Sequence, residues 1–150
     1  MTLSTRRATI RDLDALVPLF DAYRQFYAQP TDHDLARRFL RERFEHAQSI
    51  VFIAEDDGGA ALGFTQLYPS FSSTRAARIF VLNDLFVAPG GRKRGVGAAL
   101  LAAAADYSRG EGAASLALST GRTNLTAQSL YEAQGWKRDD VFLSYDLSLT

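Results

Sequence analysis

A glycine-rich loop with three consecutive cations is the part of the sequence best suited to bind a ligand. Arg92, Lys93 and Arg94 stand directly before Gly95-Val96-Gly97, where an alanine-rich helical stretch begins. The first N–H groups of a helix are unpaired and carry its positive dipole end, and glycines let a phosphate approach the backbone closely. An apolar run over 81–87, typical of a buried strand, precedes the loop. The spacing predicts an anion-binding junction between a strand and a helix, with a solvated basic turn as the alternative.

This loop resembles the Arg/Gln-x-x-Gly-x-Gly/Ala motif of the GNAT superfamily of acyl-CoA N-acyltransferases. The preceding residues, 82–89, fit the Leu-x-x-Leu-x-Val-x-Pro strand found before that motif. The resemblance implies that the loop holds the pyrophosphate of acetyl-CoA, the cosubstrate. It also implies that the strand before the loop binds the pantetheine arm through its backbone, and N–H groups there are suited to polarise the thioester carbonyl. The residues implied in this region are Leu85, Phe86, Val87, Arg92, Lys93, Arg94, Gly95, Val96, Gly97 and Ala98.

A second stretch, 124–136, resembles the GNAT pattern Asn-x-x-Ala-x-x-Leu-Tyr-Glu-x-x-Gly-Phe/Trp. In that family the asparagine contacts the coenzyme, and the tyrosine hydrogen-bonds or protonates the departing thiolate. Asn124 is also a suitable helix N-cap, and Tyr131 falls on an apolar helical stripe, so capping and core packing remain alternatives. Because a tyrosine (pKa ~10) is a weaker acid than a thiol (pKa ~8.5), we expect Tyr131 to stabilise the leaving sulfur by a hydrogen bond.

In an N-acyltransferase of this kind an acid binds and deprotonates the acceptor amine, and Asp84 is the candidate for that role. The strand 82–87 is similar to the Leu-Glu-Asp-Phe-Phe-Val strand of diamine and histone-type N-acetyltransferases, in which the acidic pair binds and deprotonates the amine. Here Asn83 replaces the first acid, which argues against strict polyamine specificity. An alkyl amine has a pKa near ~10.4 and must lose a proton, so Asp84 would act directly or through water. A purely structural carboxylate is the alternative.

The chemistry predicted is transfer of an acetyl group from acetyl-CoA to a primary amine of a small molecule, polyamine-like or other, in a ternary complex. The sequence has no cysteine, which excludes a cysteine acyl-enzyme. Tyr131 and Asp84 are the expected catalytic residues, and Tyr23 and Tyr27 are expected to line the acceptor pocket unless they only pack the core. The alternatives are a protein lysine or N-terminal amine as acceptor, and an acyl-CoA-binding module without turnover.

The composition limits the class of protein. The 150 residues carry 17 cationic and 17 acidic side chains and are 47% apolar, which predicts one globular domain and no bulk nucleic-acid binding. No apolar stretch approaches the roughly 18 residues of a membrane span, and the start of the chain lacks a signal-peptide core, so we expect a cytoplasmic protein. The two histidines have no metal-ligand spacing, and no metal is expected.

The helices and strands expected from the sequence form an α/β fold, with a mixed sheet of about six or seven strands flanked by four helices. Hydrophobic periodicity predicts helices over 12–28, from a cap at 31 or 32 through about 47, over 95–109 ended by Gly110, and from 123 or 124 to 134. The arginines of the second helix are interpreted as a solvated face. Strands are expected over 5–10, 49–55, 60–70, 78–87, 114–119, 136–137 and 141–149. The last strand is expected to pair across subunits in a homodimer.

Overall fold

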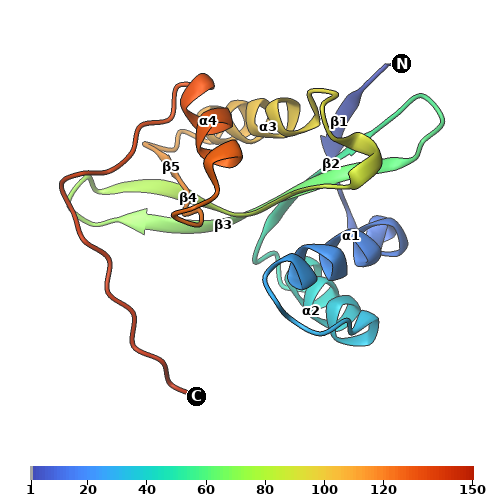
Figure 1. Cartoon of the computed structure of the whole chain (residues 1–150). Helices are drawn as coiled ribbons and strands as arrows, with labels where there is room; N and C mark the ends of the chain where they lie inside the picture. Colours follow the sequence, from blue (N-terminus) through green and yellow to red (C-terminus); the bar gives the residue numbers. More distant parts are fainter. Residues whose placement is uncertain (1) are drawn as a thin grey trace. The chain divides into compact units, whose positions relative to one another are not determined.

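The computed structural model describes residues 2–150, which form two compact units that divide after Ser119 (Figure 1). The first unit contains the sheet and most helices, and the second contains a single α-helix. The helices are α1 (Leu13–Phe26), α2 (His33–Glu45), α3 (Val96–Gly110) and, in the second unit, α4 (Leu125–Ala133), with short 3-10 turns η1 (Ile10–Asp12) and η2 (Pro89–Gly91). The strands are β1 (Ser4–Arg7), β2 (Ile50–Glu55), β3 (Ala61–Ser72), β4 (Ala77–Val87) and β5 (Leu116–Ala117).

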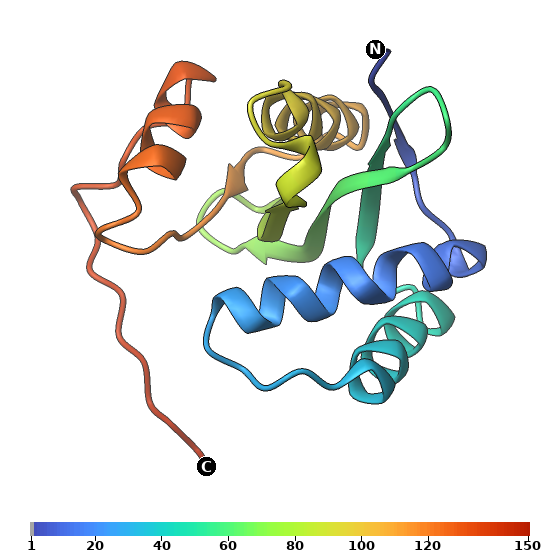
Figure 2. The ribbon, with the colours of Figure 1, turned by 45° about the vertical axis from the view of Figure 1, so that its right-hand side comes forward.

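The strands of the first unit form one sheet in the order β1-β2-β3-β4-β5. The first four strands are antiparallel neighbours, and β5 runs parallel to β4 after the crossover through α3. Helices α1 and α2 lie on one face of this sheet and α3 lies on the other (Figure 2). The predicted α/β class, the mixed sheet and the four helices are confirmed. None of the helices in residues 2–150 is long and apolar enough to cross a membrane.

The core on the α1 and α2 side follows from helical spacing. Leu13, Leu16, Val17 and Phe20 are buried along one face of α1, as the apolar periodicity requires, and they meet the central strands through Phe64 of β3. Burying each such side chain contributes about 1.5–3 kcal/mol, so this face fixes α1 on the sheet.

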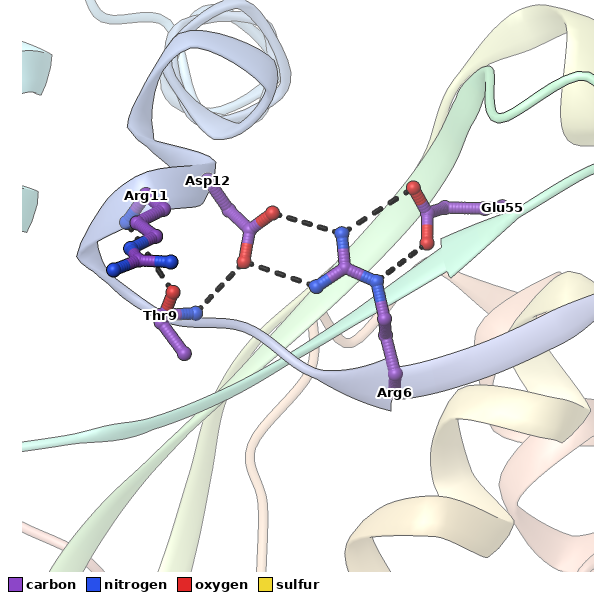
Figure 3. Close-up of polar contacts among 5 residues, drawn as sticks. All are labelled: Arg6, Thr9, Arg11, Asp12 and Glu55. Atoms are coloured by element: carbon purple, nitrogen blue, oxygen red, sulfur yellow. Dashed lines mark hydrogen bonds and ion pairs between the residues drawn. The ribbon is translucent and has the colours of Figure 1, made fainter.

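Arg6 ties the first strand to its neighbours (Figure 3). Its Nε donates to Glu55 of β2 at 2.7 Å, and its Nη2 donates to Asp12 of η1 at 2.8 Å. Asp12 in turn accepts the backbone N–H of Thr9 at 2.8 Å. The hydrogen bond from Arg6 is the main cause of a lowered pKa at Asp12. This network fixes the chain at the start of α1, the helix that bears Tyr23.

The C-terminal strands are the main error of the sequence prediction. The sheet of the described residues has five strands, and residues 134–150 contain no strand. The large apolar side chains between Val141 and Leu149 are 76–91% exposed. A strand needs a hydrogen-bonding neighbour, and alternation alone does not supply one. The strand predicted over 114–119 is likewise reduced to Leu116–Ala117.

Helix ends follow local chemistry. Asp32 accepts the N–H of Leu35 at 3.0 Å and caps α2, as one of the two predicted caps. Gly110, predicted to end α3, is its last helical residue. The left-handed conformation that a helix C-terminus favours falls at Gly112, with φ +72°.

Candidate active site

Asp84 lies at an irregularity in β4. Gln66 of β3 pairs with Asp84, and Leu67 pairs with Leu82, so Asn83 is an extra residue without a partner in the ladder. Such a β-bulge redirects the neighbouring side chains and backbone groups. The carbonyl of Asn83 accepts a hydrogen bond from the hydroxyl of Tyr23 at 3.1 Å. The bulge therefore joins α1 to β4 beside Asp84.

A buried chain of polar groups holds the Asp84 carboxylate. The hydroxyl of Ser49 donates to Gln66 Oε1 at 2.7 Å, and Gln66 Nε2 donates to Asp84 Oδ2 at 2.7 Å. The amide of Asn83 donates to Asp84 Oδ1 at 2.8 Å. Gln66 and Asp84 are 0% and 1% exposed. Neutral hydrogen-bond donors thus hold both carboxylate oxygens of Asp84 in a fixed orientation.

Burial raises the pKa of Asp84, and the hydrogen bonds from Asn83 and Gln66 and the nearby Tyr23 hydroxyl oppose that rise. No cation hydrogen-bonds to the carboxylate in the described part of the chain, so its charge is compensated by dipoles. A carboxylate in such surroundings takes up a proton more readily than an exposed aspartate. It is therefore a better base than Asp84 would be on the surface.

Asp84 opens on a cavity of about 320 Å³ between α1, α2 and the central strands. Four aromatic rings form most of its wall. The lining residues are Phe20, Tyr23, Arg24, Leu35, Phe39, Tyr68, Asn83 and Asp84. Burial raises the pKa of the Tyr68 hydroxyl to about 12 and that of Tyr23 further. Both phenols are therefore neutral hydrogen-bonding groups at physiological pH.

The two tyrosines expected at the acceptor pocket differ in position. Tyr23 lines the cavity next to Asp84. Tyr27 is 51% exposed and packs edge-on against Tyr23, with ring centroids 5.2 Å apart, and it is not part of the cavity wall. Tyr27 supports the ring of Tyr23 from outside.

The basic glycine loop lies between β4 and α3. Gly95 has φ +78° and Lys93 has φ +62°, so two residues of the loop use the left-handed region. Gly95 supplies no side chain to the first turn of α3, whereas Asp32 and Asn124 cap α2 and α4. The first N–H groups of α3 thus have no capping side-chain oxygen from the N-cap residue, which suits an anionic ligand.

The arginines of the loop are held by carbonyl groups of the loop and of the strand before it. Arg94 Nη1 donates to Gly90 O at 2.6 Å, and Arg92 Nε donates to Val87 O at 3.3 Å. The loop is also packed closely on β3, because a Cβ atom at Gly91 would come within 3.0 Å of Leu62 O. The residues present therefore fit a pyrophosphate: open helix N–H groups, a close backbone and three cations.

The strand before the loop has one edge available. Leu85, Phe86 and Val87 pair with β3 on one side, while β5 pairs only with Phe80 and Val81. Within the described residues no strand covers the other edge of 85–87. Backbone groups on that edge are suited to hydrogen-bond an extended ligand.

Asn124 and Tyr131 belong to the second unit. Asn124 Oδ1 accepts the N–H of Ala127 at 3.2 Å, so its role as N-cap of α4 is confirmed. Tyr131 is partly buried on α4, and its ring centroid lies 6.1 Å from that of Trp136. Trp136 N also donates to Tyr131 O at 3.0 Å, which closes the end of the helix.

Several residues of the site were missed by sequence reasoning. Gln66 and Ser49 orient Asp84, and Arg24, Phe39 and Tyr68 line the cavity. Gln66 carried a usable signal, because a lone amide inside an apolar strand is expected to be buried with a partner. For Arg24 no local signal exists, since arginine on a helix usually faces solvent. Residues 2–150 contain no group of three or more His, Cys, Asp or Glu side chains placed to hold a metal ion.

Comparison with known proteins identifies relatives over most of the chain. Residues 14–136 match the model of the acetyltransferase (GNAT) family. The chain is 46% identical over 147 residues to the uncharacterized N-acetyltransferase YhfO of Bacillus subtilis (strain 168), covering 98% of each protein. It is 35% identical over 88 residues to an aminoglycoside N(6')-acetyltransferase type 1 of Klebsiella aerogenes, covering 57% of this chain and 58% of that enzyme.

A solved structure agrees with the fold. The crystal structure of a probable acetyltransferase superposes with a TM-score of 0.92 at 37% identity, covering 100% of this chain and 99% of the other. Its similarity spans both units of the chain. The family match, the B. subtilis relative and this structure lead to one conclusion: the chain belongs to the GNAT acetyltransferase family and is an acetyl-CoA-dependent N-acetyltransferase.

Proposed function

We propose that this enzyme acetylates the primary amine of a small molecule bound in the aromatic cavity beside Asp84. The observation that carries the proposal is the buried Ser49-Gln66-Asp84 chain, which presents an oriented carboxylate to that cavity. A cavity of about 320 Å³ is at the lower end of the range for small-molecule sites. Its size favours a small amine over a folded protein surface.

The first step required of the protein is removal of a proton from the ammonium form of the acceptor. Asp84 accepts this proton, directly or through a water molecule, and the surrounding amides keep its oxygens fixed in direction beside the cavity. The aromatic wall lowers the local dielectric constant and so strengthens the attraction between ammonium and carboxylate. Asp84 in this role both binds the acceptor and prepares it for attack.

The second part of the site holds the acyl donor. Bound acetyl-CoA supplies an activated acetyl thioester and a thiolate leaving group. Arg92, Lys93 and Arg94 and the first N–H groups of α3 bind the pyrophosphate, and the free edge of 85–87 binds the extended arm. The remaining coenzyme-binding residues in this proposal are Gly95, Val96, Gly97, Ala98 and Asn124. With the amine deprotonated, direct attack needs no covalent enzyme intermediate, in keeping with the absence of cysteine.

Replacing Tyr131 by phenylalanine is expected to slow turnover by about tenfold or more while leaving acetyl-CoA affinity nearly unchanged. The phenol would stabilise the departing sulfur in the transition state, and only that interaction is lost. Steady-state kinetics give kcat, and calorimetry gives the affinity. Unchanged turnover would remove Tyr131 from the mechanism.

We further propose that the whole chain acts as one GNAT domain and that two copies pair through the segment 141–149. From Leu143 to Leu149 apolar residues alternate with serine or aspartate, a pattern that suits a strand with one covered face, and the large apolar side chains of 141–149 are 76–91% exposed in the single chain. Light scattering is expected to give twice the 16.5 kDa of the chain. A mass equal to one chain contradicts the dimer.

The small-amine function is tested by thiol release from acetyl-CoA with a set of primary amines. Release that depends on both enzyme and amine, with a matching acetylated product, is the expected result. Protein lysine peptides in the same assay address the competing acceptor class.

A further inference from the structure

Arg24 gives the acceptor cavity a positive charge and a buried N–H group without an acceptor. The residue lies on α1 and lines the same cavity as Asp84. Its Nη1 atom is buried and has no hydrogen-bond acceptor in the described part of the chain. A guanidinium can only donate, so a buried N–H of this kind is unfavourable until an acceptor reaches it.

A second guanidinium stands behind the cavity wall. Arg43 at the end of α2 packs over the ring of Phe39, with Cζ 4.4 Å from the ring centroid, and Phe39 lines the cavity. Its side chain is only 20% exposed, and its Nε also has no acceptor among residues 2–150. Its charge acts on the Tyr68 hydroxyl and opposes the rise of that group's pKa. Arg43 therefore adds positive potential to the wall formed by Phe39 and Tyr68.

The acids around the cavity are few or already engaged. Asp84 is the single carboxylate among the described residues that line it. Asp21, a buried acid on α1, accepts from Thr31 Oγ1 at 2.6 Å and from Asp32 N at 2.8 Å. These hydrogen bonds are the main causes of its lowered pKa, and the charges of His33 and Arg24 add to them, but Arg24 does not hydrogen-bond to it. Glu42 bonds Arg43 through Nη2 at 3.2 Å, on the exposed side. Asp84 and Arg24 are thus the charged side chains that line the cavity among the described residues, and Arg43, bonded to Glu42, lies behind its wall.

This charge pattern disfavours a polycationic acceptor. A polyamine or an aminoglycoside would place several ammonium groups in a cavity with one carboxylate, and the remaining ammonium groups would meet the positive charge of Arg24. Like charges repel more strongly in a partly closed, aromatic-walled cavity than in bulk water. The aromatic rings between the two charged ends suit an apolar body.

Building on the proposed small-amine acetylation, we infer that the acceptor is an amine that also carries a carboxylate. Its ammonium group lies at Asp84 and its carboxylate lies at Arg24. Its apolar body lies among the aromatic rings of the cavity, Phe20, Tyr23, Phe39 and Tyr68. Arg24 is then a residue that determines specificity. A planar guanidinium fork matches a carboxylate in geometry as well as in charge.

The test compares acceptors that differ only in the carboxylate. The probes are phenylalanine, phenylalanine methyl ester and 2-phenylethylamine, then 6-aminohexanoate and hexylamine, with spermidine and kanamycin as polycations. In at least one pair kcat/KM is expected to be at least about tenfold higher for the carboxylate, because losing one partner of an enclosed charged contact typically costs that much or more. Calorimetric binding of the same compounds, with CoA present, is expected to follow the same order.

Substitutions test whether Arg24 causes the preference for acceptors that carry a carboxylate. In Arg24→Gln the ratio between the paired acceptors is expected to fall close to one, and Arg24→Lys is expected to retain part of it. Arg38→Gln removes the same charge from an exposed position of α2 outside the cavity wall and is expected to keep the full ratio. Circular dichroism checks that each variant folds.

Equal or better use of the uncharged amines or of the polycations would overturn the inference, as would an unchanged ratio in folded Arg24→Gln. In these outcomes amines are still acetylated, so the proposed function stands. Acetyl-CoA binding without acetylation of any probe contradicts the proposed function itself and this inference with it.

Discussion

Replacing Asp84 by asparagine is expected to lower kcat/KM for the amine by about 10²–10⁴-fold, the usual contribution of a general base. Asparagine keeps the shape of the side chain but cannot accept the proton of the ammonium group. Steady-state kinetics at saturating acetyl-CoA measure the loss. Acetyl-CoA affinity is expected to change little, because the coenzyme loop is a separate part of the site.

The fold is expected to tolerate this change. Burial raises the pKa of Asp84, so the native state holds the proton more tightly than the unfolded chain does. The charged carboxylate therefore costs stability as the pH rises through its native pKa, and asparagine removes that cost. Gln66 can reverse its amide to accept a hydrogen bond from the substituted side chain, because Ser49, its other partner, can donate or accept. The melting temperature is expected to stay within a few degrees at pH 7.

A matched control and a pH profile separate catalysis from structure. Asp106→Asn makes the same chemical change at a side chain that is 80% exposed on α3, and its activity is expected to equal that of the natural enzyme. In the natural enzyme kcat/KM is expected to fall as the pH drops through the raised pKa of Asp84, and this acid limb is expected to be lost in Asp84→Asn. Activity of Asp84→Asn within about threefold of the natural enzyme, far less than a general base contributes, would show that Asp84 is a structural carboxylate.

The double substitution Arg92→Glu and Arg94→Glu is expected to weaken acetyl-CoA binding by at least about a hundredfold. Each charge-assisted hydrogen bond to a phosphate contributes about 1.5–3 kcal/mol, and the new carboxylates also repel the pyrophosphate. The weakening should be greatest at low salt, since exposed charges are screened at high salt. Calorimetric titration with CoA at two ionic strengths measures both effects.

The control for this prediction has the same change of net charge elsewhere. Arg38→Glu with Arg41→Glu alters two exposed arginines of α2 and is expected to leave CoA affinity within about twofold. Arg92 and Arg94 also bond Val87 O and Gly90 O, so the melting temperature of the loop variant has to be measured alongside. Equal loss of affinity in both double variants would indicate a general charge effect, and the loop would then have no special role.

The parts of the molecule that depend on local sequence could be predicted. The glycine loop and the helix after it follow from residue spacing, and the hairpin turn between β2 and β3 follows from Asp56 to Gly59, where Gly59 N donates to Asp56 O at 3.0 Å. The caps Asp32 and Asn124 follow from residue type and position. Each of these features is decided within a few residues of chain.

The acceptor side depends on contacts between distant residues. The bulge at Asn83 arises from the register of β4 against β3, and the orientation of Asp84 requires Ser49 and Gln66, which lie far away in sequence. The helical pattern of α2 predicts a solvated face for its arginines, but packing against Phe39 covers most of Arg43. The periodicity of a helix identifies its apolar face and does not reveal which charged side chains other elements will cover.

In the C-terminal segment the local sequence pattern predicts an element that does not form. Its alternation from Leu143 to Leu149 is a clear strand pattern, yet the segment makes no ladder in the described residues. A strand forms only when a second segment hydrogen-bonds to it, and the pattern of one segment does not show whether such a partner exists.

Acetylation of a small amine is measured by the release of CoA thiol from acetyl-CoA, followed with and without a primary amine and paired with mass spectrometry of the product. We predict release that rises with amine concentration, a product heavier by one acetyl group on the amine nitrogen, and loss of both in Asp84→Asn. Tight CoA binding with only amine-independent hydrolysis, across amines, amino acids and lysine peptides, would contradict acetylation of small amines by this enzyme.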